Sequence, residues 1–186
     1  MSDDSGIALQ GVSHVALVCS DMARTVEFYD GMLGMPLVKT TEVPIPGRGG
    51  QHFFFDVGNG DLLAFFMVPG MPGPAPGIAG QDGLDSIDSA IGSMHHLAFK
   101  VSPDVLRRRR QRLAEVGIDY VYLDHKVDGT MGVDESIDGD DDTFAQSVYF
   151  KDPDGISLEF CAWGPAFDTV GVDHEPMRVS DTAGAH

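Results

Sequence analysis

The chain is poor in cysteine and in basic residues, and both shortages narrow what it can be. Its two cysteines, Cys19 and Cys161, form neither a disulfide framework nor a thiolate zinc motif and are expected to be small core residues. The chain has 12 Lys and Arg residues and 29 Asp and Glu residues, which gives a formal net charge of −17. Such a charge repels phosphate backbones and anionic lipids, so we expect neither a nucleic-acid partner nor a membrane partner.

Long hydrophobic runs are also lacking. No apolar stretch approaches the roughly 20 residues that a membrane-spanning helix needs. The acidic start, MSDDSG, has neither the basic residues nor the apolar segment of a secretory signal, so we expect a cytoplasmic protein. The length of 186 residues fits one compact domain or two small modules that share a core.

An internal repeat divides the chain into two similar halves. The segment VSHVALVCS at 12–20 is similar to MHHLAFKVS at 94–102, and the alignment pairs His14 with His96. Alternating apolar residues predict a strand in each segment, followed by a capped helix that ends at a glycine. These helices are expected over 21–33 and 103–116.

A second pair of similar segments predicts a β-hairpin in each half, because a Gly-containing turn separates two apolar runs. FFFDVGNGDLLAFF at 53–66 aligns with VYFKDPDGISLEFC at 148–161, which pairs Ala64 with Glu159. One further strand is expected in each half, at 35–43 and at 118–123. Each half is therefore predicted to be a βαβββ unit.

The predicted fold class is α+β. Neither half can bury both faces of its strands alone, so the two modules are expected to form a cup-shaped, eight-stranded mixed sheet with the helices outside. In chain order, we expect a first βαβββ module at 11–68, a Pro/Gly-rich linker at 69–92, a second module at 93–163 with an acidic insertion at 124–143, and a partly ordered tail at 164–186.

Three side chains on the expected inner face suggest a metal site. Strand alternation places His14 and His96 toward the hollow, and Glu159 is a lone carboxylate in the apolar run SLEFCAW. Buried Glu159 needs a cation or strong hydrogen-bond donors. Two imidazoles and one carboxylate form the triad associated with Fe(II), although Mn, Ni, Co and Zn accept the same donors. Ala64, at the related fourth position, cannot ligate, which leaves room for substrate.

Through these residues the chain resembles the vicinal oxygen chelate superfamily, which includes glyoxalase I, extradiol dioxygenases, fosfomycin-resistance thiol transferases and metal-free bleomycin-binding proteins. The resemblance covers roughly 11–163, and its most specific stretch is YFKDPDGISLEF at 149–160. It implies that His14, His96 and Glu159 bind one divalent ion. It also implies a small-molecule substrate and favours a homodimer.

The signature Tyr-x-x-Asp-Pro-x-Gly-x-x-x-Glu, from Tyr149 to Glu159, resembles that of the extradiol dioxygenases. An Fe(II)-dependent, dioxygenase-like oxidoreductase acting on vicinal oxygens is therefore the leading hypothesis, with Tyr149 donating a hydrogen bond to the bound catecholate or oxygen species. The dioxygenase signature also expects an upstream histidine, where this chain has aspartates at 140–142. Two alternatives stay open: a glyoxalase-like isomerase, lyase, epimerase or thiol transferase that uses Ni, Zn or Mn, and a metal-free binding protein of the resistance type.

Other histidines are secondary candidates. His125 follows the strand expected at 118–123 and could act as a general base. His95 is expected on the opposite strand face from His96, and His52 begins a strand of the first module. The arginine-rich helix face at 107–112 and the acidic run at 138–142 are expected to be solvated surface.

Overall fold

The computed structural model describes residues 11–73, 91–133, 139–169, 171 and 176. Most of the expected linker at 69–92 and of the expected tail at 164–186 lies outside these ranges. No helix among the described residues is long and apolar enough to cross a membrane.

The first half of the chain forms a four-stranded sheet. Its elements are β1 (His14–Val18), α1 (Met22–Val26), the π-helical segment η1 (Glu27–Met32), β2 (Leu37–Glu42), β3 (Gln51–Gly58) and β4 (Asp61–Met67). The strand order is β1-β4-β3-β2, with β1 parallel to β4 and the other pairs antiparallel. Asp21 begins the helical region, because its carboxylate accepts a hydrogen bond from the backbone N–H of Arg24.

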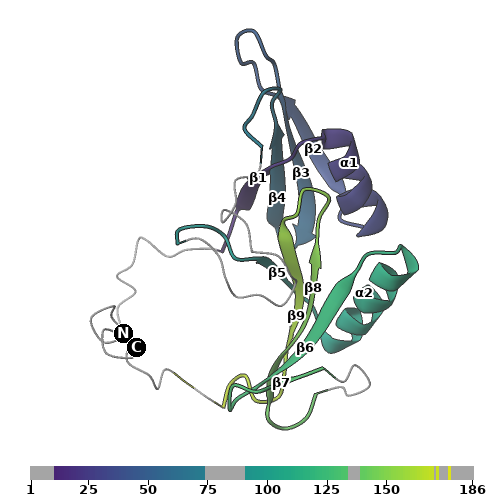
Figure 1. Ribbon diagram of the computed structural model, residues 1–186, viewed down its shortest axis with the longest axis vertical. Helices are drawn as coiled ribbons and strands as arrows, with labels where there is room; N and C mark the ends of the chain where they lie inside the picture. The colour runs from purple at the N-terminus through teal and green to yellow at the C-terminus, as the bar shows by residue number, and fades with distance from the viewer. Residues whose placement is uncertain (1–10, 74–90, 134–138, 170, 172–175, 177–186) are drawn as a thin grey trace.

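The second half repeats this plan with one additional strand. Its elements are β5 (Leu97–Lys100), α2 (Pro103–Glu115), β6 (Tyr120–Lys126), β7 (Met131–Gly132), β8 (Thr143–Lys151) and β9 (Ser157–Trp163), and the strand order is β5-β9-β8-β6-β7. Figure 1 shows α1 and α2 on the same side of the two sheets. The α+β class and the repeated βαβββ plan are therefore confirmed.

The sheets differ from the expectation in two respects. Among the described residues, the four-stranded and five-stranded sheets are separate, whereas one eight-stranded sheet was expected. The strand expected at 118–123 also continues to Lys126, so part of the expected insertion at 124–143 is β-structure. Charged residues can enter this strand because they are paired. The ammonium group of Lys126 binds the buried carboxylate of Asp124 at 2.9 Å and the exposed carboxylate of Asp142 at 2.9 Å.

A polar contact links the two halves at the turn between β8 and β9. Asp154 accepts hydrogen bonds from the backbone N–H of Ser20 at 2.9 Å and from the guanidinium group of Arg24 at 2.8 Å. The buried hydroxyl group of Tyr29 donates to Asp152 at 3.2 Å. One apolar core cluster contains residues from both halves, so the two sheets have a defined relative placement.

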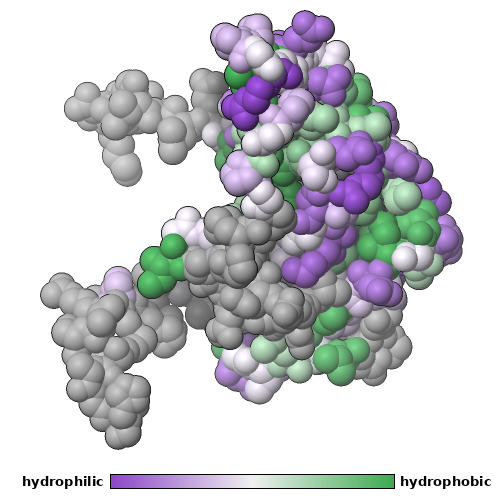
Figure 2. Space-filling view, turned by 45° about the horizontal axis from the view of Figure 1, so that its top comes forward, coloured by the Kyte–Doolittle hydropathy of each residue, from purple (hydrophilic) through white to green (hydrophobic). Residues whose placement is uncertain are grey.

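In Figure 2, hydrophilic residues cover much of the face that comes forward, with hydrophobic residues in smaller areas between them. The sheet face of β1 that points away from the core is different, because His14, Ala16 and Val18 are all exposed there. The first sheet therefore carries an accessible histidine on a largely apolar strand face.

We expect the substitution Asp154→Ala to destabilise the fold by about 1–2 kcal/mol, because several hydrogen bonds between the halves would be lost. The ion pair itself adds little to this value, since the Arg24 side chain is 48% exposed. Urea unfolding measures the change. Asp119→Ala is the matched control, because Asp119 is exposed and has no hydrogen bond or ion pair with another described residue. Equal midpoints for the two variants would contradict the role given to Asp154.

Candidate metal and substrate site

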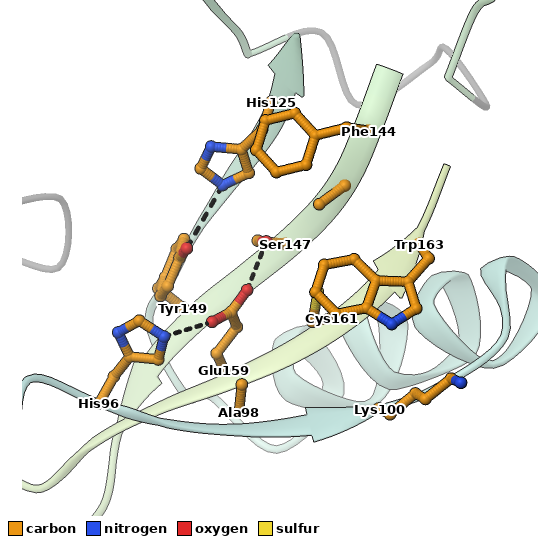
Figure 3. Close-up of a pocket in the computed structure, with 11 residues that line it drawn as sticks. His96, Ala98, Lys100, His125, Phe144, Ser147, Tyr149, Glu159, Cys161 and Trp163 are labelled. Carbon is orange, nitrogen blue, oxygen red and sulfur yellow. Dashed lines mark hydrogen bonds and ion pairs between the residues drawn. The ribbon is translucent and has the colours of Figure 1, made fainter. Parts of the chain in front are cut away.

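The second sheet contains a pocket of about 340 Å³ on the face opposite α2. The strand register sets its lining residues in rows across the sheet. Ala98, Glu159 and Tyr149 form one row; Lys100, Cys161 and Ser147 form the next; Trp163, Ala145 and His125 form a third. Because alternate residues of a strand point to the same face, these side chains share the pocket (Figure 3).

A buried carboxylate lies at the centre of this pocket. Glu159 is only 4% exposed, and its Oε2 atom lies 2.7 Å from Nε2 of His96. Its Oε1 atom accepts a hydrogen bond from the hydroxyl group of Ser147 at 2.5 Å. Burial alone would raise the pKa of Glu159, but the hydrogen bonds with His96 and Ser147 outweigh burial and lower it. Glu159 is therefore ionised at neutral pH and positioned to share a cation with His96.

His95 contacts His96 from the side away from Glu159. The Nδ1 atoms of the two rings lie 2.7 Å apart, so one ring donates a hydrogen bond to the other. This contact orients the His96 ring and leaves its Nε2 atom directed at Glu159. Nε2 of His95 is buried without a hydrogen-bond partner among the described residues.

Tyr149 and His125 form a second polar pair in the pocket. The hydroxyl group of Tyr149 lies 3.3 Å from Nε2 of His125, and its ring centroid lies 5.6 Å from that of His96. Burial, helped by Glu159, raises the pKa of Tyr149 to about 12, and burial lowers the pKa of His125. The phenol therefore keeps its proton and donates a hydrogen bond to Nε2 of the neutral His125 imidazole (Figure 3). His125 lies within β6, not after the strand as expected.

The remaining histidine of the expected triad lies on the other sheet. His14 is exposed on β1, where its Nδ1 atom lies 3.0 Å from the hydroxyl group of Ser13. In the part of the chain that the structure describes, no cluster of three or more His, Cys, Asp or Glu side chains is arranged to hold a metal ion. The structure thus brings together His96 and Glu159 and places His14 on the first module.

His52 is also on the first sheet, outside the pocket. Its ring stacks on Phe66 with a centroid separation of 3.6 Å. Burial, together with the nearby His14 and Lys39, lowers its pKa, so the ring is neutral at pH 7. Ala64 is fully buried and pairs with Ala16 of β1. Its methyl side chain cannot bind a metal ion.

Sequence reasoning missed Ser147 and Trp163 as pocket residues, whereas strand alternation places Lys100 on the same face as His96. The signal was present for Ser147, because it lies two residues before Tyr149 on the same strand and hence on the same face. Cys19 and Cys161 are both buried and unpaired, as expected for small core residues. Cys161 also lines the pocket, where burial and the adjacent Glu159 raise its pKa to about 12 and keep it a thiol.

Comparison with known proteins agrees with this architecture. The chain is similar to the metallothiol transferase FosB of Lysinibacillus sphaericus (strain C3-41), with 23% identity over 154 residues that cover 83% of each protein. A solved glyoxalase family protein from Enterococcus faecalis is 25% identical, with a TM-score of 0.55, and the match covers 82% of this chain and 97% of that one.

A further solved structure shares the fold. It is the fosfomycin resistance protein FosX from Listeria monocytogenes, complexed with Mn(II) and sulfate; it is 15% identical, with a TM-score of 0.51, and the match covers 88% of this chain and 100% of that one. The family model described as Glyoxalase/Bleomycin resistance protein/Dioxygenase superfamily matches residues 11–160. That match spans most of the chain and both sheets, and it confirms the resemblance to vicinal oxygen chelate proteins. This protein therefore belongs to the Glyoxalase/Bleomycin resistance protein/Dioxygenase superfamily.

Proposed function

We propose that this protein is a metal-dependent enzyme that adds a nucleophile to a small molecule bearing vicinal oxygens. The observation that carries the proposal is the buried, ionised Glu159 with His96 at 2.7 Å on the pocket wall. An ionised carboxylate in such a place needs strong hydrogen-bond donors or a cation, and Glu159 faces a pocket through which a cation can reach it. A pocket of about 340 Å³ beside it is large enough for a small-molecule substrate.

The donor set fits a divalent metal ion. One carboxylate and imidazole nitrogens suit Mn, Fe, Co, Ni and Zn. Glu159 and His96 would supply two donors, and the fixed contacts with Ser147 and His95 would orient them. His14 would supply the third donor. When bound, the ion would supply Lewis-acid polarisation of the substrate's oxygens.

We infer that His14 reaches this site from a second copy of the chain. Within one chain, Asp154 and the shared core hold the two modules together, and no three-ligand cluster forms among the described residues. Two copies related by a twofold axis can lay the first sheet of each over the second sheet of the other, which creates two equivalent sites. This homodimer would also cover Val18 and Trp163, which are 49% and 43% exposed.

The pair formed by His125 and Tyr149 would handle the proton of the reaction. Because His125 is neutral, its Nε2 atom can take a proton from a nucleophile that enters the pocket when Tyr149 turns its hydroxyl hydrogen away. Tyr149 stays protonated, so it can instead donate a hydrogen bond to a substrate oxygen. His125 is thus positioned as a general base and Tyr149 as a hydrogen-bond donor.

Relatives favour addition or transfer over ring cleavage. FosB is named a metallothiol transferase, and the FosX structure was obtained with Mn(II). We therefore favour Mn(II) over Fe(II) and a thiol or water nucleophile over O₂. A dioxygenase remains the second candidate, because the stretch from Tyr149 to Glu159 matches the signature of that class.

We expect metal-free protein to take up about one Mn(II) ion per chain, and we expect Glu159→Gln to weaken this binding at least about tenfold by removing a charged donor. Mass spectrometry of the metal after gel filtration measures the uptake. Glu115→Gln is the matched control, because Glu115 is an exposed carboxylate on α2. If wild-type protein retains none of Mn(II), Fe(II) and Zn(II), the result contradicts the proposal and favours the alternative of a metal-free binding protein.

We expect His125 to titrate below its ordinary pKa of 6.5, because burial disfavours the charged imidazolium. The neutral, basic form should then persist as the pH falls to 6.5, and activity that depends on it should decline only below that value. NMR titration of the histidine ring protons measures the pKa, and His125→Gln identifies the signal by its loss. A pKa of His125 at or above 6.5 would contradict the proposal that buried His125 is the neutral base.

We expect no oxygen uptake when protein loaded with Fe(II) is mixed with catechol. The physical reason is that the base and donor pair suits addition, while the upstream histidine expected of a ring-cleaving enzyme is replaced by aspartates at 140–142. An oxygen electrode measures the rate, and protein-free Fe(II) is the control. Protein-dependent oxygen uptake would overturn the transferase assignment in favour of a dioxygenase.

A further inference from the structure

Lys100 is a cation in the pocket without a charged partner among the described residues. It lies on β5, its side chain is exposed along the pocket wall, and it makes no hydrogen bond or ion pair with any other described residue. The other lysines are engaged: Lys126 with three aspartates, Lys151 with the hydroxyl group of Ser157, and Lys39 over the ring of Phe54.

The position of Lys100 defines the far end of the pocket. It follows His96 by four residues along the same edge of the sheet, which corresponds to about 13 Å in extended chain. Figure 3 shows Glu159 and His96 together, with the side chain of Lys100 on the opposite side of Ala98. Glu159 is the only carboxylate among the lining residues, and it is occupied by His96 and Ser147. The two ends therefore differ in charge.

Beside Lys100 the wall of the pocket is apolar and partly aromatic. Trp163 is stacked on Phe167 with a centroid separation of 4.1 Å, which fixes the plane of its indole ring. Phe144 lies farther along the pocket, beside His125, with ring centroids 5.7 Å apart (Figure 3). A flat apolar group is the ligand that such a wall accommodates, because aromatic rings favour stacked or edge-on neighbours.

We propose that the Lys100 end of the pocket binds the anionic group of an elongated organic acid whose planar, apolar body lies along Trp163. The inference rests on the proposed function for the other end, where the vicinal oxygens of the same molecule would meet the His96 and Glu159 side chains. Lys100 is accordingly a specificity-determining residue, and its contact with the anion takes no part in the chemical step.

The anion contact can be tested without a metal ion. The probes are 3-phenylpropanoate and its uncharged amide, which have the same body and no vicinal oxygens. Trp163 is the only tryptophan of the chain, so its fluorescence reports binding in the pocket. We expect metal-free wild-type protein to bind the carboxylate about tenfold more tightly than the amide, because only the carboxylate pairs with the lysine.

Lys100→Gln should reduce this preference to about onefold and leave the affinity for the amide unchanged. Lys151→Gln is the matched control, since it removes the same charge from the same sheet outside the pocket, and it should keep the tenfold preference. An equal preference in wild-type protein and Lys100→Gln, or an equal loss in both variants, would overturn the proposal.

A second pair of probes separates this proposal from the proposed function. With Mn(II) present, 3-(3,4-dihydroxyphenyl)propanoate should bind more tightly than 3-phenylpropanoate, because it adds vicinal oxygens. If Mn(II) brings no such gain while the Lys100-dependent preference persists, the metal assignment fails and the anion site stands. If the gain is present and the preference is absent, the anion site fails and the metal assignment stands.

Discussion

The structure depends on how one buried charge is satisfied. Glu159 lies in an otherwise apolar strand, and such a carboxylate is tolerated only because one oxygen atom meets His96 and the other meets Ser147. That requirement ties β9 to β5 and β8 in a single register, which in turn brings Tyr149 beside Glu159. The same contacts keep the carboxylate ionised, which makes it a ligand for a cation.

The arrangement of the modules determines what one chain can do alone. The turn between β8 and β9 binds the start of α1, and both helices lie on the same side of the sheets (Figure 1). The faces bearing His14 and Glu159 are therefore not brought together by the contacts within the chain. A second copy of the chain can supply the third ligand, because an isologous contact can pair the first module of each copy with the second module of the other.

Much of this account could be predicted from the sequence. The repeat predicted both βαβββ units and paired His14 with His96, because period-two alternation and glycine turns are local signals. Ser147 and the strand at Asp124 and Lys126 were missed, since their placement depends on partners distant in the chain. Periodicity also cannot tell whether two modules of one chain face each other, so a single eight-stranded sheet was expected and two sheets were found.

The most direct test of the shared metal site combines two defective chains. His14→Ala and Glu159→Ala variants with different affinity tags are expressed together, and the mixed dimer is isolated with both tags. Its Mn(II) content is then compared with that of each variant alone. A shared site predicts about one ion per mixed dimer and almost none in either parent dimer, because one of the two sites regains all three ligands. A mixed dimer as empty as its parents would contradict the account.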